Sequence, residues 1–304
     1  MLGFTPGVLV MGALHLDVIV SAPALPRLDE TMMGKGVEYR LGGKGGNQAV
    51  ASTRMGSIAT MVGCVGTDGF ADQIRAELTR SGVNIQAVLV REGASGMSVA
   101  IVQEDGSYGA VVVSGVNLQV DANQAPLERP PTVVVLQNEI PAHQNHALLA
   151  RLQSQTRVIW NAAPALAHDA VMLARADLLV VNRLEAAMQS GLDESLPNPD
   201  KALDILHASG AKAAIITLGS EGYIGSDVDG RVFRSEGHRV KVVSTHGAGD
   251  VFVGALAAQL AQGESVAAGA RFAQAAAALH VASETTVRHR ITPEDVSRFL
   301  ASQH

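Results

Sequence analysis

The 304-residue sequence contains little cysteine, few aromatic residues and no long run of charge of one sign. Its single cysteine, Cys64, permits no internal disulfide and supplies no thiolate cluster for a metal. Aromatic residues make up 3% of the chain, too few for a carbohydrate-binding surface built on stacked rings. The net charge is −6 and no lysine- or arginine-rich segment occurs, so the sequence lacks the basic footprint of a nucleic-acid-binding protein.

No hydrophobic run is long enough to span a membrane, and no basic leader precedes the apolar residues 8–14, which Asp17 soon follows. We therefore expect no signal peptide and no membrane partner, and we expect a cytoplasmic protein. Hydrophobic residues make up 47% of the chain, which is enough for a large core. Since no repeat, linker or low-complexity segment interrupts the sequence, residues 1–304 are predicted to form a single domain.

Apolar segments alternate with segments of helical period along most of the chain. The β-type segments are apolar throughout, which predicts a mostly parallel sheet buried on both faces. Helices between such strands indicate an α/β fold with three α/β/α layers. The expected strands are residues 8–14, 58–64, 132–136, 158–161, 178–181, 213–218 and 240–243, and the expected helices are 47–54, 70–81, 143–153, 185–190, 201–208, 251–261 and 270–282.

Three segments break this alternation, at about residues 15–22, 31–41 and 97–114. Each contains short β-type runs, and residues 104–106, Glu-Asp-Gly, have the composition of a hairpin tip. These segments are not each followed by a helix, as the strands of the body are. They are therefore predicted to form a small β-sheet that projects from the α/β body. Long excursions of this kind often serve as lids over a binding site.

The strongest chemical signal is in residues 244–250, which read Ser-Thr-His-Gly-Ala-Gly-Asp between an expected strand and an expected helix. Two glycines there leave backbone N–H groups unshielded at the positive end of a helix, where phosphate oxygens bind. The carboxylate of Asp250 would repel such an anion unless it accepts a proton from a hydroxyl that attacks the phosphorus. The motif therefore predicts phosphoryl transfer, although taken alone it also fits an ordinary helix start with an acidic first turn.

A second glycine-rich segment, residues 42–49, reads Gly-Gly-Lys-Gly-Gly-Asn-Gln-Ala. Its four glycines permit close approach of a ligand to the backbone, and Lys44 and Asn47 add hydrogen-bonding groups. A merely flexible loop is the alternative, but this segment runs directly into an expected helix. Its spacing is not that of a P-loop, and no dinucleotide-binding fingerprint follows the first strand.

Together these segments resemble the ribokinase, or PfkB-type, carbohydrate kinase family over nearly the whole chain. The resemblance implies a ribokinase-like three-layer α/β/α sandwich with a small β-sheet lid. Residues 42–49 resemble the N-terminal signature of the family and residues 247–250 its C-terminal signature. Further matches are residues 161–165 (Asn-Ala-Ala-Pro-Ala, where ribokinases have Asn-Pro-Ala-Pro-Ala), 182–185 (an Asn-x-x-Glu motif) and 217–220 (Thr-Leu-Gly-Ser, at the nucleotide).

The resemblance implies an ATP- and Mg²⁺-dependent kinase that phosphorylates the primary hydroxyl of a small sugar, with a pentose such as ribose favoured. Homodimers paired through the lid are common in related kinases, so a homodimer is predicted as well. The implied catalytic residues are Asp250 as the base, with Gly247, Ala248 and Gly249 around the transferred phosphoryl group. The implied nucleotide residues are Asn182, Thr217 and Gly219, with Glu185 at Mg²⁺ through water, and the implied sugar residues are His15, Asp17, Gly43, Lys44, Asn47 and Glu139.

Several of these residues also have structural explanations. Asn182 and Glu185 fit an ordinary helix start, and Glu139 taken alone fits a solvated loop. Asp17 interrupts an apolar run, so it needs a partner or a ligand unless it points to solvent from an edge strand. The function has alternatives too, namely a nucleoside or ketohexose kinase of the same family, or a non-catalytic sugar-binding descendant. Asp250 argues against the last, because binding a sugar does not require a proton acceptor.

Two departures from the family pattern change what is expected. His15 stands where ribokinases have an asparagine that binds the sugar, so it either tunes substrate choice or serves only as a substitute hydrogen-bonding group. Many relatives bind an activating K⁺ through an aspartate and the carbonyls of a later glycine-containing loop. Here Ser244 replaces the aspartate and residues 282–287 lack the glycine, which predicts weak or absent K⁺ activation and an anion loop held by hydrogen bonds from Ser244 or Thr245. His246 is assigned no role.

Overall fold

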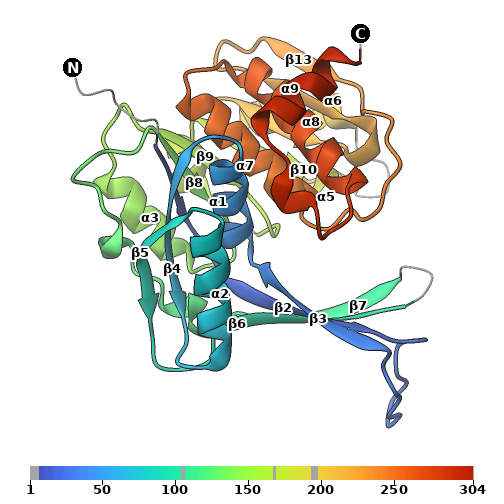
Figure 1. Cartoon of the computed structure of the whole chain (residues 1–304). Coiled ribbons are helices and arrows are strands. Elements are labelled where there is room, and N and C mark those ends of the chain that lie inside the picture. The colour runs from blue at the N-terminus through green and yellow to red at the C-terminus, as the bar shows by residue number, and fades with distance from the viewer. Residues whose placement is uncertain (1–6, 104–106, 167–168, 193–197, 304) are drawn as a thin grey trace.

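The computed structural model describes residues 7–103, 107–166, 169–192 and 198–303, and within them the chain forms two separate sheets (Figure 1). The small sheet has the order β3 (Gly36–Gly42), β2 (His15–Ser21), β6 (Gly96–Val102) and β7 (Tyr108–Val113). The large sheet has the order β13 (Val232–Ser235), β12 (Tyr223–Ser226), β11 (Ala214–Thr217), β10 (Leu178–Asn182), β9 (Arg157–Asn161), β8 (Val133–Leu136), β1 (Gly7–Met11), β4 (Ile58–Val65) and β5 (Asn84–Val90).

The large sheet is parallel from β5 to β11, and only β12 and β13 pair antiparallel. Strand β1 lies in the middle of the sheet and is buried on both faces, which explains why its residues are apolar throughout. Val8 and Val10 pack into the core on one face, whereas Leu9 and Met11 pack into the core on the other face. All four side chains are at most 2% exposed. The expected mostly parallel sheet, buried on both faces, is confirmed.

Helices cover both faces of the large sheet and complete a three-layer sandwich. Helices α1 (Lys44–Arg54), α2 (Gly69–Arg80), α7 (Ala248–Ala261), α8 (Val266–Ala282) and α9 (Pro293–Ala301) contribute side chains to one core. Helices α3 (Ala142–Arg151), α4 (Ala170–Arg175), α5 (Arg183–Ser190) and α6 (Pro199–Ala208) contribute to the other core. None of the helices within the described ranges is long and apolar enough to cross a membrane.

Helices α1 and α7 are in contact although they lie far apart in the sequence. The Ser52 hydroxyl of α1 donates a hydrogen bond of 3.0 Å to the carbonyl oxygen of Gly254 in α7. Phe252, Leu256 and Leu260, spaced four residues apart on α7, are all at most 4% exposed. The two glycine-rich segments at the starts of these helices therefore lie side by side.

The small sheet extends away from the sandwich, at the lower right of Figure 1. All four of its strands come from the three segments predicted to form a small sheet, and the segment 97–114 supplies both β6, which begins one residue earlier, and β7. The expected hairpin tip at residues 104–106 lies outside the described residues. Expected strand residues 31–35 are irregular, and β3 begins only at Gly36.

One expected strand is wrong. Residues 240–243 form no strand, and Val242 and Val243 are 54% and 42% exposed. The backbone N–H groups of Val243 and Ser244 both donate to the carbonyl oxygen of Val281 in α8 instead of pairing with a strand. An apolar run predicts a strand only where a sheet edge is free to accept it, and this run lies against the end of a helix.

The start of α1 also differs from the expected residue 47, because the helix begins at Lys44. Glycine disfavours helix, so the sequence pattern predicted a loop here. Gly43 caps the helix with φ of 80°, and a Cβ atom on it would lie 2.6 Å from the carbonyl oxygen of Ala13. Close packing on the end of β1 therefore requires glycine at this position independently of any ligand.

Candidate active site

The implied site residues gather where the parallel strands end and two helices begin. Glu139 follows β8, while Asn182 and Thr217 are the last residues of β10 and β11. Lys44 is the first residue of α1, and Asp250 lies in the first turn of α7. Open α/β sheets bind ligands at this edge, because the strand ends leave a crevice there.

The Asp250 carboxylate is fixed by two side-chain amides of α1. Asn47 Nδ2 donates to Asp250 Oδ2 at 3.2 Å, and Gln48 Nε2 donates to Asp250 Oδ1 at 3.0 Å. Gln48 is itself fixed, because its Nε2 donates to Asn161 Oδ1 at 3.0 Å and its Oε1 accepts from Gln137 Nε2 at 2.7 Å. Amide donors on both oxygens hold the carboxylate in one orientation.

The turn that precedes Asp250 presents backbone donors at the positive end of α7. Gly247 caps the helix in the left-handed conformation, with φ of 76°. Within the described part of the chain, the N–H groups of Gly247, Gly249 and Asp250 donate to no protein acceptor. The N–H of Ala248 differs, because it donates to the carbonyl oxygen of Thr245 at 3.2 Å. Three free donors at a helix N-terminus form an anion-binding turn.

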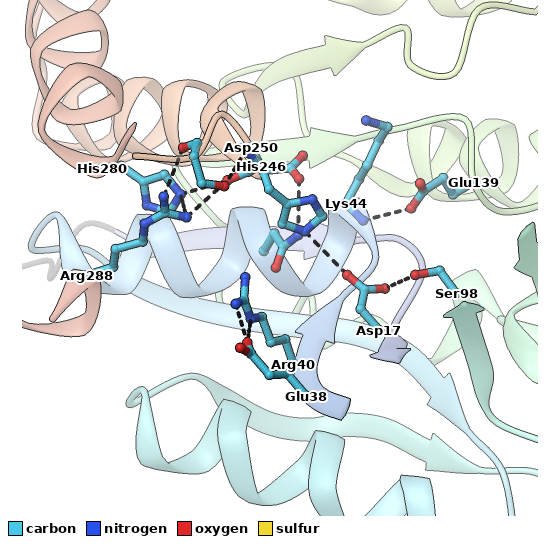
Figure 2. Close-up of polar contacts among 12 residues, drawn as sticks. Asp17, Glu38, Arg40, Lys44, Ser98, Glu139, His246, Asp250, His280 and Arg288 are labelled. Atoms are coloured by element: carbon cyan, nitrogen blue, oxygen red, sulfur yellow. Dashed lines mark hydrogen bonds and ion pairs between the residues drawn. The ribbon is translucent and has the colours of Figure 1, made fainter. Parts of the chain in front are cut away.

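The Lys44 ammonium lies among three carboxylates. Burial alone would lower its pKa, but the negative charges of Asp250, Glu139 and Glu185 outweigh burial and raise the pKa of Lys44 above its usual value. The backbone N–H of Lys44 donates to Glu139 Oε2 at 2.7 Å (Figure 2). Lys44 is therefore a permanent positive charge beside the Asp250 carboxylate.

Glu139 is half-buried beside this lysine. Burial raises the pKa of its carboxyl to about 7, and the nearby charges of Asp250 and Asp17 add to the effect, while Lys44 opposes it. Only one of its oxygens receives a described protein donor, from the Lys44 backbone. A carboxyl group that is half-protonated near neutral pH is unusual at a solvated loop and is typical of a functional site.

Asp17 is 6% exposed, so the alternative of an edge-strand carboxylate in solvent is wrong. Its strand β2 lies between β3 and β6 in the small sheet. Ser98 of β6 donates to Asp17 Oδ1, and His246 Nε2 lies 3.5 Å from Asp17 Oδ2 (Figure 2). Burial acts to raise the pKa of Asp17, but the hydrogen bonds from His246 and Ser98 lower it below its usual value.

His15 lies two residues from Asp17 on the same face of β2, as expected from the strand period. It is 4% exposed, and its Nε2 atom has no hydrogen-bond partner among the described residues. Burial lowers the pKa of His15 despite the nearby charge of Asp17. A buried ring nitrogen without a protein partner is uncommon, so packing alone does not account for histidine at this position.

The nucleotide residues implied by the resemblance lie together on neighbouring strands. Asn182 pairs with Thr217 across β10 and β11, and Gly219 starts the short 3₁₀ helix η3 (Gly219–Glu221) just beyond. Asn182 and Glu185 also form a capping box, since each side chain accepts the backbone N–H of the other at 2.8 Å. The structural explanation of this pair therefore holds, and burial raises the pKa of Glu185.

Sequence reasoning missed the residues that support the site. Gln48, Gln137 and Asn161 form the amide network behind Asp250, and all three are at most 7% exposed. Their signal was present, because polar amides inside apolar segments must find partners when buried. His246 was assigned no role, yet its ring contacts Asp17 across the gap between the anion-binding turn and the small sheet. Ser98, His280 and Arg288 gave no signal in the sequence.

Comparison with known proteins identifies the family. Residues 6–291 match the family described as pfkB family carbohydrate kinase. A ribokinase of Schizosaccharomyces pombe is 34% identical over 292 residues, which cover 90% of this chain and 91% of that protein. A deoxyribokinase of Salmonella typhi is 28% identical over 301 residues, which cover 96% of this chain and 98% of that protein.

The fold agrees with this match. A solved structure of Arabidopsis thaliana ribokinase complexed with ribose and ATP superposes with a TM-score of 0.85 at 26% identity, covering 98% of this chain and 99% of that chain. The similarity thus includes both sheets as well as the two glycine-rich segments. The chain belongs to the pfkB family of carbohydrate kinases.

Proposed function

We propose that this protein transfers the γ-phosphoryl group of ATP to the primary hydroxyl of a pentose, with ribose as the first candidate. The observation that supports this most directly is the Asp250 carboxylate, fixed by two amides beside three free N–H donors and the Lys44 ammonium. A sugar-binding protein needs no such proton acceptor at an anion-binding turn. The similarity to a ribokinase and a deoxyribokinase supports a pentose.

In the proposed step, Asp250 accepts the proton of the sugar hydroxyl while the oxygen of that hydroxyl forms a bond to the γ-phosphorus. The bond between that phosphorus and the bridging oxygen of ATP breaks, and ADP leaves with the bonding electrons. The free N–H groups of Gly247, Gly249 and Asp250 stabilise the charge on the phosphoryl oxygens, as does Lys44. These donors are already in place, so no reorganisation is needed during the reaction.

The sugar is proposed to lie between the anion-binding turn and the small sheet. Asp17, Asn47 and Glu139 would accept or donate hydrogen bonds to its hydroxyls, while Gly43 and Lys44 border the site from the start of α1. His15, with its unpartnered Nε2, would lie on the same side as Asp17. Closure of the small sheet as a lid would exclude water that competes as a phosphoryl acceptor.

Asn182 and Glu185 are proposed to bind Mg²⁺ that keeps most of its water ligands. Among the described side chains, no three of His, Cys, Asp or Glu gather into a metal cage. Mg²⁺ usually keeps several waters, so one buried carboxylate is an adequate outer contact. Glu185 uses Oε2 in the capping box, and its second oxygen, together with Asn182, would hold the ion. When bound, Mg²⁺ neutralises charge on the ATP phosphates.

Thr217 and Gly219 are proposed to border the nucleotide, next to Asn182. We further propose that the protein acts in the cytoplasm, where ATP is abundant, and as a homodimer paired through the small sheet. The finer alternatives are a nucleoside or ketohexose kinase, for which the same fold and motifs would serve. The alternative of a different class is a sugar-binding descendant that lacks turnover.

An ADP-release assay over pentoses, ketohexoses and nucleosides tests this proposal, with Asp250→Asn as the inactive control. Ribose or deoxyribose is expected to give the highest kcat/KM. The product is then examined by ³¹P NMR, because a phosphate ester of a primary hydroxyl couples to two methylene protons and gives a triplet. A doublet, or a nucleoside as the best substrate, would contradict the pentose proposal, and binding of sugar without any ADP release would identify a descendant without catalysis.

A further inference from the structure

Arg288 is a buried cation that the reaction described above does not use. It lies in a short 3₁₀ helix, η4 (Arg288–Arg290), and is 6% exposed, whereas its neighbours His289 and Arg290 are exposed. Its side chain extends toward the anion-binding turn rather than into solvent (Figure 2). A long charged side chain is rarely buried unless its donors are satisfied.

The donors of the guanidinium are satisfied by backbone carbonyls from two segments. Nη2 donates to the carbonyl oxygen of Ser244 at 2.9 Å, and Nη1 donates to that of His246 at 3.4 Å. Nε donates to the carbonyl oxygen of Ser283 at 3.1 Å. Arg288 therefore joins the segment that leads into the anion-binding turn to the end of helix α8.

The positive charge of this group has no paired carboxylate. Among the described residues Arg288 forms no ion pair, and Glu284 acts on it only from beyond ion-pair distance. Burial lowers the pKa of Arg288, and the charge of Arg40 lowers it further, yet a guanidinium remains protonated in proteins. The groups that accept hydrogen bonds from the guanidinium are uncharged, so its charge is not neutralised by direct contact and its field extends to the neighbouring turn.

His280 lies between Arg288 and the same turn. His280 Nε2 lies 3.2 Å from Arg288 Nη1 and 3.0 Å from the carbonyl oxygen of His246. The neutral ring makes one of these hydrogen bonds at a time, because Nε2 either donates to the His246 carbonyl or, when the proton is on Nδ1, accepts from Arg288 Nη1. The ring also packs against Gly247, where an added Cβ atom would lie 3.5 Å from Nε2. Burial, together with the charge of Arg288, lowers the pKa of His280 to about 4, so the ring is neutral at neutral pH.

The segment held by Arg288 has few other supports. Residues 240–247 form no regular structure. Its other hydrogen bonds are mostly local or at the segment's ends: two N–H groups donate to Val281, the N–H of His246 donates to Ser244 Oγ at 3.4 Å, and the carbonyls of Thr245 and Gly247 accept from the first turns of α7. His280 Nε2 also lies 3.0 Å from the carbonyl oxygen of His246. Without the guanidinium, the carbonyls of Ser244 and Ser283 would lose their donor, and such groups move until they find another.

We propose that Arg288 is a built-in cation that fixes residues 244–250 in the conformation needed to bind the transferred phosphoryl group, so that the turn needs no mobile ion to hold its carbonyls. Arg288 is a positioning residue, since it acts through the turn and does not touch the substrate. The inference rests on the proposed function only in assigning this turn to the phosphoryl group. Loss of Arg288 is therefore expected to impair kcat more than the KM for the sugar.

The test compares Arg288→Ala, Arg288→Lys and Arg288→Gln with Arg290→Ala, which removes an exposed arginine from the same turn of helix. In folded Arg288→Ala, kcat is expected to fall about 10²-fold, the size of effect that a small misplacement of reacting groups produces. Guanidinium chloride at millimolar concentration, far below denaturing conditions, should restore part of kcat in this variant alone. Sodium chloride at equal ionic strength serves as the control for salt.

Arg288→Lys should retain more kcat than Arg288→Gln, because it keeps the charge, and this pair decides the question if Arg288→Ala does not fold. A folded Arg288→Ala with wild-type kcat would overturn the proposal. A second pattern would also overturn it: kcat falls in Arg288→Ala, guanidinium does not restore it, and Arg288→Lys and Arg288→Gln are equally active. That pattern indicates an arginine that only stabilises the fold. A wild-type protein inactive on every sugar would contradict the proposed function instead, and would be visible in the same assay before any variant is compared.

Discussion

Asp250 is the residue on which turnover should depend most. The amides of Asn47 and Gln48 donate to its two oxygens, so the carboxylate is held in a fixed orientation beside the anion-binding turn. Asp250→Asn removes the proton acceptor but keeps the size of the side chain, and kcat is predicted to fall about 10²–10⁴-fold. ATP affinity, measured by titration calorimetry, should stay close to that of the wild type. A variant that keeps more than about a third of wild-type kcat would exclude Asp250 as the general base.

Glu139 should make kcat/KM for the sugar decrease at acidic pH. Its pKa is raised to about 7, chiefly by burial, so the carboxylate form is lost as the pH falls through neutrality. If the carboxylate accepts a sugar hydroxyl, kcat/KM for the sugar decreases below about pH 7 and is constant just above it. In a profile of kcat/KM against pH, Glu139→Gln should lower the maximum value and abolish the decrease at low pH. An unchanged decrease at low pH in Glu139→Gln would assign it to another group.

His15 should determine which sugar is preferred rather than how fast it reacts. Its buried, unpartnered Nε2 lies on the face of β2 that also presents Asp17. His15→Asn shortens the side chain and replaces the ring by an amide, which changes the hydrogen-bonding pattern offered to the sugar. The order of kcat/KM values over a panel of pentoses is predicted to change, with little effect on kcat for the best substrate. The same order in both proteins would mean that His15 only packs inside the small sheet.

The sequence predicted the backbone position of a residue where a motif fixes it, and gave no indication where only tertiary contact does. Asp250 and Lys44 could be predicted because each lies at the start of a helix within a glycine-rich segment. Arg288 could not, because its exposed neighbours give its segment the pattern of an ordinary loop. Its partners, Ser244 and Ser283, contribute backbone carbonyls, which no side-chain pattern can indicate.

Among the elements, the segments around the anion-binding turn show the same limit. Residues 240–243 are apolar enough for a strand, but the end of α8 supplies their hydrogen-bond acceptor. Strands β12 and β13 were not predicted, because they are four residues long and β13 lies half exposed at the sheet edge. Helix α7 was predicted, since its apolar residues extend over several turns and are buried almost all round.

The turn between residue 244 and α7 leads to a prediction on monovalent cations. The expected support from Ser244 is present only as a 3.4 Å hydrogen bond, whereas the Ser244 and Ser283 carbonyls accept from Arg288. Carbonyls that already accept from a guanidinium are unavailable to K⁺, and the fixed charge would repel the ion. Weak or absent K⁺ activation is therefore predicted in a KCl titration at constant ionic strength and saturating substrate. Activation beyond about tenfold, equivalent to ~1.4 kcal/mol of barrier, would show a working K⁺ site.

At the scale of the whole molecule, the layered body could be predicted because a buried parallel sheet imposes a strong pattern on its strands. Strands β1, β4, β8, β9, β10 and β11 all come from runs that are apolar throughout. The relation between the body and the small sheet could not be predicted, because it depends on single contacts such as that of His246 with Asp17. Sequence pattern specifies which faces are buried but not which loops meet across a site.

The two faces of the small sheet differ in a way that predicts self-association. Asp17 and its cross-strand neighbours Arg40 and Ser98 share one face, which carries the polar groups of the site. The next row of neighbours lies on the opposite face and is apolar, with Tyr39, Val99 and Val111 at 53%, 36% and 67% exposed, and Val18 between Tyr39 and Val99. An apolar sheet face open to water is costly, and a second copy of the same sheet is the simplest cover for it.

The protein is therefore predicted to sediment as a homodimer through the micromolar range, with an interface above about 1,000 Å². Val111→Lys places a charge in the apolar row, which should shift the population toward monomer because an unpaired charge would be buried in the interface. Val232→Lys, at an exposed valine on edge strand β13 of the large sheet, is the matched control and should leave the dimer intact. Since Asp17 lies on the reverse face of the same sheet, the monomeric variant should also show a higher KM for the sugar. A wild-type protein that sediments as a monomer, or equal effects of the two lysines, would place any self-association elsewhere on the surface.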